Sequence, residues 1–172
     1  MMSLDSRSRS PRTAASAAVM LEGPGGGDDV SQPESGPRWA DLVRKVDAAV
    51  ASGEASAMLR AWQAASVGAL LDSDWASMVA VGDAAIRIGR VTGLRFAFGA
   101  KARQSYQVAL YRAHRIAAVD GVFAAAEGFA ELGDNETVEQ CLVIATRLLE
   151  KHPRREIAHK IDLLRARLTG SR

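Results

Sequence analysis

The segment from Val119 to Leu149 limits the fold of this chain more than any other part of the sequence. Small and apolar residues recur at helical spacing on both sides of Gly133 and Asp134. Glycine tolerates the left-handed conformation that often ends a helix, and either Asp134 or Asn135 can cap the helix that follows. The segment therefore predicts two antiparallel helices joined by a tight turn.

The same periodicity predicts further helices on either side of this segment. An apolar stripe starts at Trp39 and stops near Gly53, and Asp72-Ser73-Asp74 supplies N-cap chemistry for a helix that begins near Trp75. Residues 94–99 fit either a loop packed by their two phenylalanines or the beginning of the next helix. After them, small and apolar side chains gather on one helical face around Tyr106.

Composition divides the chain of 172 residues into a tail and a helical domain. Residues 1–37 contain four of the five prolines and no aromatic residue. Such a segment buries too little apolar surface to offset the entropy of ordering it, so we expect a disordered tail. The domain, residues 38–172, is expected to be all-α. Its predicted parts are hairpins at about 38–71, 74–118 and 119–152, followed by a helix at about 154–169.

Spacings of bulky and small residues recur among the predicted hairpins. The first helices share Trp39-x2-Leu42-Val43-x2-Val46, Trp75-x2-Met78-Val79-x2-Gly82 and Val122-x2-Ala125-Ala126-x2-Phe129. The second helices share Met58-x3-Trp62-x2-Ala65, Ala102-x3-Tyr106-x2-Ala109 and Val138-x3-Leu142-x2-Ala145. Small residues let paired helices approach closely, and larger ones fill the space between layers.

These patterns resemble the tetratricopeptide-repeat family, whose unit is about 34 residues long. The match is best over residues 119–152 and partial over 38–118, because roughly ten extra residues separate the two halves of the second unit. The resemblance implies a short α-solenoid with a C-terminal capping helix that covers the last apolar face. An unrelated alanine-rich helical bundle is the alternative, since it would show similar periodicity.

Residues that could support catalysis or metal binding are sparse. Cys141 is the only cysteine, which excludes an intrachain disulfide, and its position beside Leu142 predicts a packing role. His152 and His159 have Pro153 between them, which is not ligand spacing on a continuous helix. We therefore predict no enzymatic activity, no metal site and no cofactor.

Charge is distributed in blocks. Residues 84–119 contain seven basic residues, Arg95 and Arg103 among them, and no acidic one, whereas residues 120–146 contain six acidic residues and no basic one. A basic strip of this kind can receive an acidic peptide or nucleic acid, or can form internal ion pairs with the acidic hairpin. The predicted partner-binding residues are Arg87, Arg90, Lys101, Arg112 and Arg115.

The resemblance implies a protein–protein interaction module: an adaptor, scaffold or small chaperone-like protein that binds an acidic or extended segment. The alternatives are a self-associating helical protein, such as a homodimer, and a nucleic-acid-associated regulator. No apolar stretch is long enough to span a membrane. Arg7, Arg9 and Arg12 precede a short apolar run and loosely imitate a signal peptide, but Asp5 interrupts the basic region, so we expect a cytoplasmic protein.

Overall fold

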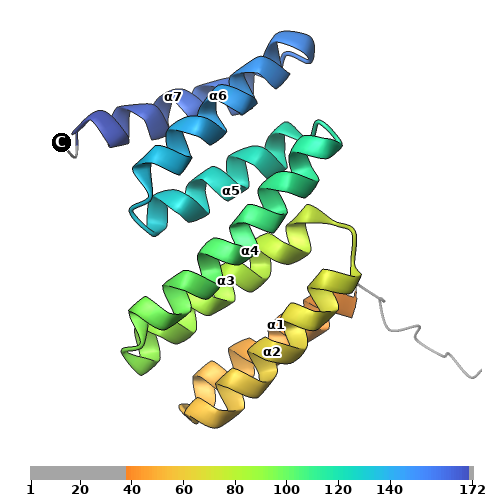
Figure 1. Cartoon of the computed structure of the whole chain (residues 1–172), viewed down its shortest axis with the longest axis vertical. Helices are drawn as coiled ribbons and strands as arrows, with labels where there is room; N and C mark the ends of the chain where they lie inside the picture. Colours follow the sequence, from red (N-terminus) through yellow and green to blue (C-terminus); the bar gives the residue numbers. More distant parts are fainter. Residues whose placement is uncertain (1–37, 171–172) are drawn as a thin grey trace, which may run out of the picture. The chain divides into compact units, whose positions relative to one another are not determined.

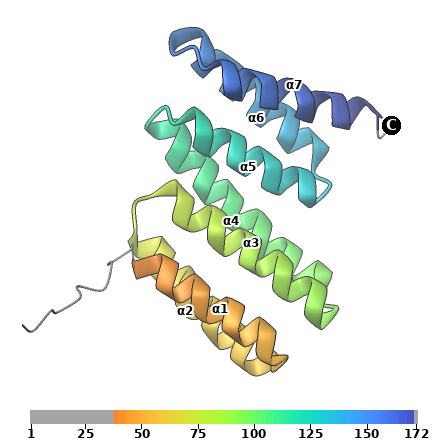
Figure 2. The same cartoon turned by 180° about the vertical axis from the view of Figure 1, so that it is seen from behind.

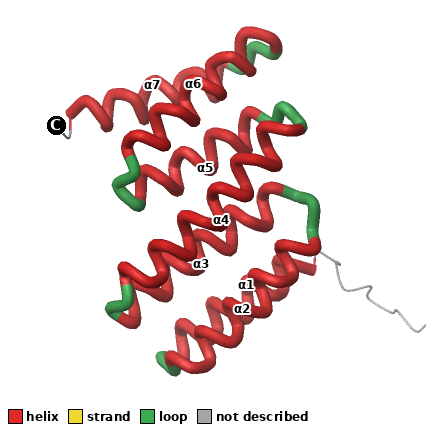
Figure 3. The backbone as a smooth tube through the Cα atoms, in the orientation of Figure 1, coloured by secondary structure: helices red, strands yellow, loops and turns green. Residues whose placement is uncertain are grey.

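The computed structural model describes residues 38–170, which form seven α-helices and no strand (Figures 1 and 3). The predicted all-α class is therefore confirmed. The predicted tail, residues 1–37, lies outside the described residues. The helices are α1 (Arg38–Ser52), α2 (Ala55–Leu71), α3 (Trp75–Thr92), α4 (Arg95–Arg115), α5 (Val119–Glu131), α6 (Asn135–Lys151) and α7 (Arg155–Gly170).

The predicted capping residues lie at the helix ends. The Asp74 carboxylate accepts a hydrogen bond from the backbone N–H of Ala76 at 3.1 Å and caps α3. The Asp134 carboxylate accepts one from the N–H of Thr137 at 3.4 Å and caps α6. Three short connections contain a glycine at positive φ: Gly53 at 75°, Gly93 at 74° and Gly133 at 72°. Local sequence therefore determines where these helices end.

Helix α4 begins at Arg95, so the loop interpretation of residues 94–99 is wrong. Phe98 is buried and its ring meets that of Trp62 edge to face, with centroids 6.3 Å apart. Phe96 is 94% exposed. Residues two positions apart on a helix point in nearly opposite directions, so the two phenylalanines cannot pack on the same side.

Consecutive helices form hairpins: α1 with α2, α3 with α4, and α5 with α6 (Figure 1). The first helices contact one another in the order α1, α3, α5 and α7, and they lie side by side in Figure 2. Helix α7 packs against both α5 and α6. The extra residues of the second hairpin lie within its helices, which makes α3 18 residues long and α4 21 residues long. The connection between the two helices stays short. The arrangement is consistent with a solenoid-like helical bundle.

The recurring small and bulky residues form the core between the helices. Ala102, Tyr106 and Ala109 of α4 are all 0% exposed, as is Phe129 of α5. The rings of Tyr106 and Phe129 meet edge to face with centroids 5.8 Å apart. Burying one large side chain of this kind stabilises the fold by about 1.5–3 kcal/mol. The same packing fixes α3, α4 and α5, whose outer side chains form the surface described next.

Candidate partner-binding surface

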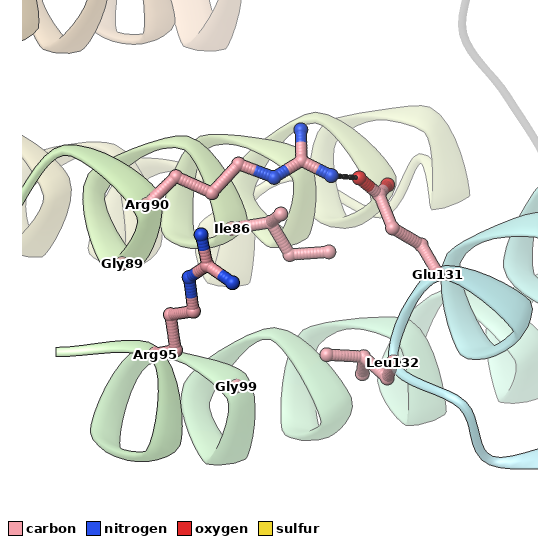
Figure 4. Close-up of a pocket in the computed structure, with 7 residues that line it drawn as sticks. All are labelled: Ile86, Gly89, Arg90, Arg95, Gly99, Glu131 and Leu132. Atoms are coloured by element: carbon pink, nitrogen blue, oxygen red, sulfur yellow. Dashed lines mark hydrogen bonds and ion pairs between the residues drawn. The ribbon is translucent and has the colours of Figure 1, made fainter. Parts of the chain in front are cut away.

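The five predicted binding residues do not form one continuous basic surface. Arg87 of α3 extends towards α1, where its Nη2 lies 2.7 Å from Oδ1 of Asp47. Arg90 extends in the other direction and pairs with Glu131 at the end of α5 (Figure 4). Two of the predicted arginines therefore connect neighbouring first helices.

Lys101 and Arg112 of α4 lie against α2. The Lys101 ammonium is 4.9 Å from the centroid of the Trp62 ring, a cation–π distance. The Arg112 guanidinium donates hydrogen bonds to the carbonyls of Ala69, Leu70 and Asp74 at 2.9, 3.1 and 3.0 Å. Arg112 thus satisfies carbonyls around the C-terminus of α2, where a positive charge also favours the helix dipole.

Arg115, the fifth predicted residue, is exposed on the last turn of α4. Within residues 38–170 it forms no hydrogen bond or ion pair. Its guanidinium is therefore available for a partner, unlike that of Arg112 one turn earlier on the same helix.

The basic segment (residues 84–119) and the acidic segment (residues 120–146) form ion pairs with each other. Arg103 of the basic segment donates to Asp134 of the acidic segment at 2.9 Å, in addition to the pair of Arg90 with Glu131. Burial opposes ionisation of Asp134, but the hydrogen bonds from Arg103 and Thr137 outweigh it and lower the pKa of this carboxyl group. Exposed pairs contribute about 0–1 kcal/mol each, so their main effect is to align the hairpins.

A cavity of about 280 Å³ lies between α3, the first turns of α4 and the end of α5 (Figure 4). We call it the arginine pocket. Arg95 extends from α4 towards Arg90 and Ile86, and Glu131 reaches the cavity from the opposite side. Its lining consists of Ile86, Gly89, Arg90, Arg95, Gly99, Glu131 and Leu132.

The arginine pocket has an unbalanced charge. Arg90 and Arg95 contribute two positive charges and Glu131 one negative charge, which leaves a net charge of +1. Arg90 is paired with Glu131, whereas Arg95 forms no hydrogen bond or ion pair with any residue in the described range. A guanidinium can hold one carboxylate through two parallel hydrogen bonds. The pocket therefore suits a ligand with a single negative charge.

Apolar side chains are exposed close to this pocket along the chain. Val91 and Leu94 are each 56% exposed, and Phe96 is 94% exposed. Arginine and aromatic residues are enriched at protein–protein interfaces. The sequence analysis placed Arg95 in the basic strip but not among the five predicted binding residues, and it did not identify Phe96 as a binding residue.

The part of the chain that the structure describes offers neither a metal site nor a reactive cysteine. No group of three His, Cys, Asp or Glu side chains there could hold a metal ion. Cys141 is fully buried, and this desolvation raises the pKa of its thiol to about 12, so the reactive thiolate is scarce at neutral pH. None of the helices between residues 38 and 170 is long and apolar enough to cross a membrane.

Comparison with known proteins adds no relative. No protein-family model matches the chain, and neither the curated proteins nor the solved structures contain a significant match.

Proposed function

We propose that this chain is a non-enzymatic protein-interaction module, a tetratricopeptide-like adaptor, scaffold or small chaperone, that binds an acidic segment of a partner protein at the arginine pocket. One observation carries the proposal: the unpaired guanidinium of Arg95 lies in a cavity beside the Arg90–Glu131 ion pair. A carboxylate from the partner would complete the charge balance there.

The pocket and its surroundings provide two kinds of contact for such a segment. A hydrogen bond to a charged group contributes about 1.5–3 kcal/mol, which makes Arg95 the expected anchor for a carboxylate. Ile86 and Leu132 line the cavity and can pack against the methylene groups of the bound acidic side chain. Leu94 and Phe96 expose apolar surface that the flanking residues of the segment can cover.

The distribution of ion pairs favours a protein partner over a nucleic acid. Arg87, Arg90 and Arg103 already face carboxylates of the chain itself. Nucleic-acid binding draws its affinity from many basic side chains that neutralise successive phosphates. These three arginines are already paired with carboxylates and would have to break those pairs to bind phosphates. A single unpaired guanidinium with apolar neighbours fits one acidic side chain better.

Affinity capture with the full chain tests this proposal. Proteins retained by the immobilised chain are identified by mass spectrometry, and the capture is repeated with Arg95→Glu. The matched control is Arg147→Glu, which makes the same charge change at an exposed arginine of α6. We expect Arg95→Glu to abolish capture of the specific partner, with helicity and melting temperature unchanged, and the control to retain it. Equal capture by both variants would refute the proposal.

A further inference from the structure

A second cavity adjoins the arginine pocket on the other side of α5. It has a volume of about 430 Å³ and lies between the end of α5, the first residue of α6 and the second half of α7. We call it the α5–α7 pocket. Glu131 lines both cavities, so the last turn of α5 separates them. The lining of the α5–α7 pocket consists of Glu127, Ala130, Glu131, Asn135, Leu164, Arg167 and Leu168.

A single extended segment can reach both cavities. Helix α5 contacts α3 on one side and α7 on the other, and these three helices lie side by side in Figure 2. Packed helices are about 8–10 Å apart, which also sets the approximate separation of the cavities on the two sides of α5. In a polyproline II chain, which rises about 3.1 Å per residue, side chains three positions apart lie on the same side and about 9 Å apart. Two such side chains match the two pockets.

The unpaired charged groups of the two pockets have opposite signs. Glu127 and Glu131 give the α5–α7 pocket two carboxylates, and Arg167 gives it one guanidinium. Glu131 is paired with Arg90, and Arg167 has an interaction of its own. Glu127 is exposed and forms no hydrogen bond or ion pair with any described residue. The unpaired group is thus a carboxylate here and the guanidinium of Arg95 in the arginine pocket.

The position of Glu127 favours a basic side chain in the α5–α7 pocket. Glu127 and Glu131 are four residues apart on α5, a spacing at which like charges repel. Arg90 offsets this repulsion at Glu131, but no described cation does so at Glu127. Leu164 and Leu168 line the same cavity. The methylene stem of a lysine or arginine can pack against such leucines while its charged end reaches a carboxylate.

We propose that the acidic segment held at the arginine pocket also carries a basic side chain, which occupies the α5–α7 pocket and pairs with Glu127. This inference rests on the proposed function and narrows the partner to a segment of mixed charge, with its acidic and basic residues about three positions apart. Glu127 is then a specificity-determining residue. It attracts the basic side chain and repels a segment that is acidic throughout.

Fluorescence anisotropy of labelled peptides with the full chain tests this inference. Each peptide has blocked ends and a central glutamate between leucines, and the residue three positions to either side of the glutamate is lysine, glutamine or glutamate. We expect the lysine peptide to bind about fivefold more tightly than the glutamine peptide, which is near the most that an exposed ion pair provides. The glutamate peptide should bind more weakly than either.

Two variants assign the effect to Glu127. Glu127→Gln should remove the advantage of the lysine peptide and leave the affinity for the glutamine peptide unchanged. Glu150→Gln is the matched control, because it makes the same change at an exposed glutamate of α6, and it should keep the advantage.

The outcomes separate this inference from the proposed function. Equal binding of the lysine and glutamine peptides, or a lysine advantage that persists in Glu127→Gln, would overturn the inference and leave the arginine pocket as the acidic site. If neither peptide binds, or if Arg95→Glu binds both as the wild type does, the proposed function and the inference both fail.

Discussion

The Tyr106 hydroxyl on α4 donates a hydrogen bond to Oδ1 of Asp83 on α3 at a distance of 2.7 Å. The Tyr106 ring is fully buried and lies against Gly82 of α3 and Gly128 of α5. A Cβ atom added to either glycine would be 2.5 Å from a ring carbon. One side chain thus holds together the three helices that form the arginine pocket.

The Tyr106 ring lies so close to Gly128 that position 128 has no room for a side chain. We expect Gly128→Ala to lower the free energy of unfolding by about 1–3 kcal/mol, because the added methyl group would have to displace a buried aromatic ring. Chemical denaturation followed by circular dichroism measures the change. Gly99→Ala is the matched control within α4, since its Cβ would meet only a Leu132 side-chain carbon, at 3.7 Å.

The control should change stability in the opposite direction. Alanine favours a helix interior over glycine by up to about 1 kcal/mol, so Gly99→Ala should leave stability unchanged or raise it. If both variants had the same stability, the Tyr106 ring would not be confined by Gly128.

Asp83 should make a titratable contribution to stability. Burial raises the pKa of its carboxyl above the ordinary 3.8, although the Tyr106 hydrogen bond and Arg87 oppose the shift. The folded state therefore holds this proton more tightly than the unfolded state. Its contribution to the free energy of unfolding falls as pH rises from 3.8 through the higher folded pKa, and is constant above it.

Asp83→Asn tests that sign because asparagine can accept the Tyr106 hydrogen bond and does not titrate. Denaturation of both proteins over an acidic pH series gives the difference in their free energies of unfolding. We expect the variant to gain stability relative to wild type as pH rises through this interval, with a plateau above it. A difference that is constant or that falls with pH would contradict the raised pKa.

Arg112 should matter for folding, whereas Arg115 should not. Arg112→Ala removes the donors to three carbonyls around the end of α2 and should destabilise the protein by about 1–3 kcal/mol. Arg115→Ala removes an exposed side chain without a partner in the described range and should change stability by less than about 0.5 kcal/mol. Thermal melts at low protein concentration compare the two, and equal effects would contradict the capping role of Arg112.

Cys141 should report unfolding. Its side chain is fully buried and the pKa of its thiol is raised to about 12, so a thiol reagent should not react with the folded protein. We expect labelling at neutral pH to increase with denaturant along the same curve as loss of helicity. Rapid complete labelling without denaturant would show that α6 opens independently of the rest.

The helices could be predicted from sequence because their signals are local. Gly133 and Asp134 mark one turn by their own conformational and capping preferences, and the small residues around Tyr106 identify its buried face. The surface could not be predicted in the same way. Helical periodicity places Lys101 and Arg112 opposite the face centred on Tyr106, but it does not show that α2 covers that side. Which arginines are paired depends on contacts between helices, and these are not encoded in any single helix.

The most direct test of the central claim is a nuclear magnetic resonance titration of the full chain with two short peptides. One peptide has a glutamate between leucines and blocked ends, and the other has glutamine in its place. We predict that the glutamate peptide shifts the Arg95 side-chain signal and the backbone amides of Gly89 and Gly99. The glutamine peptide should do so far less, and Arg95→Glu should remove the response. Equal shifts with both peptides, or no shift at Arg95, would contradict the account.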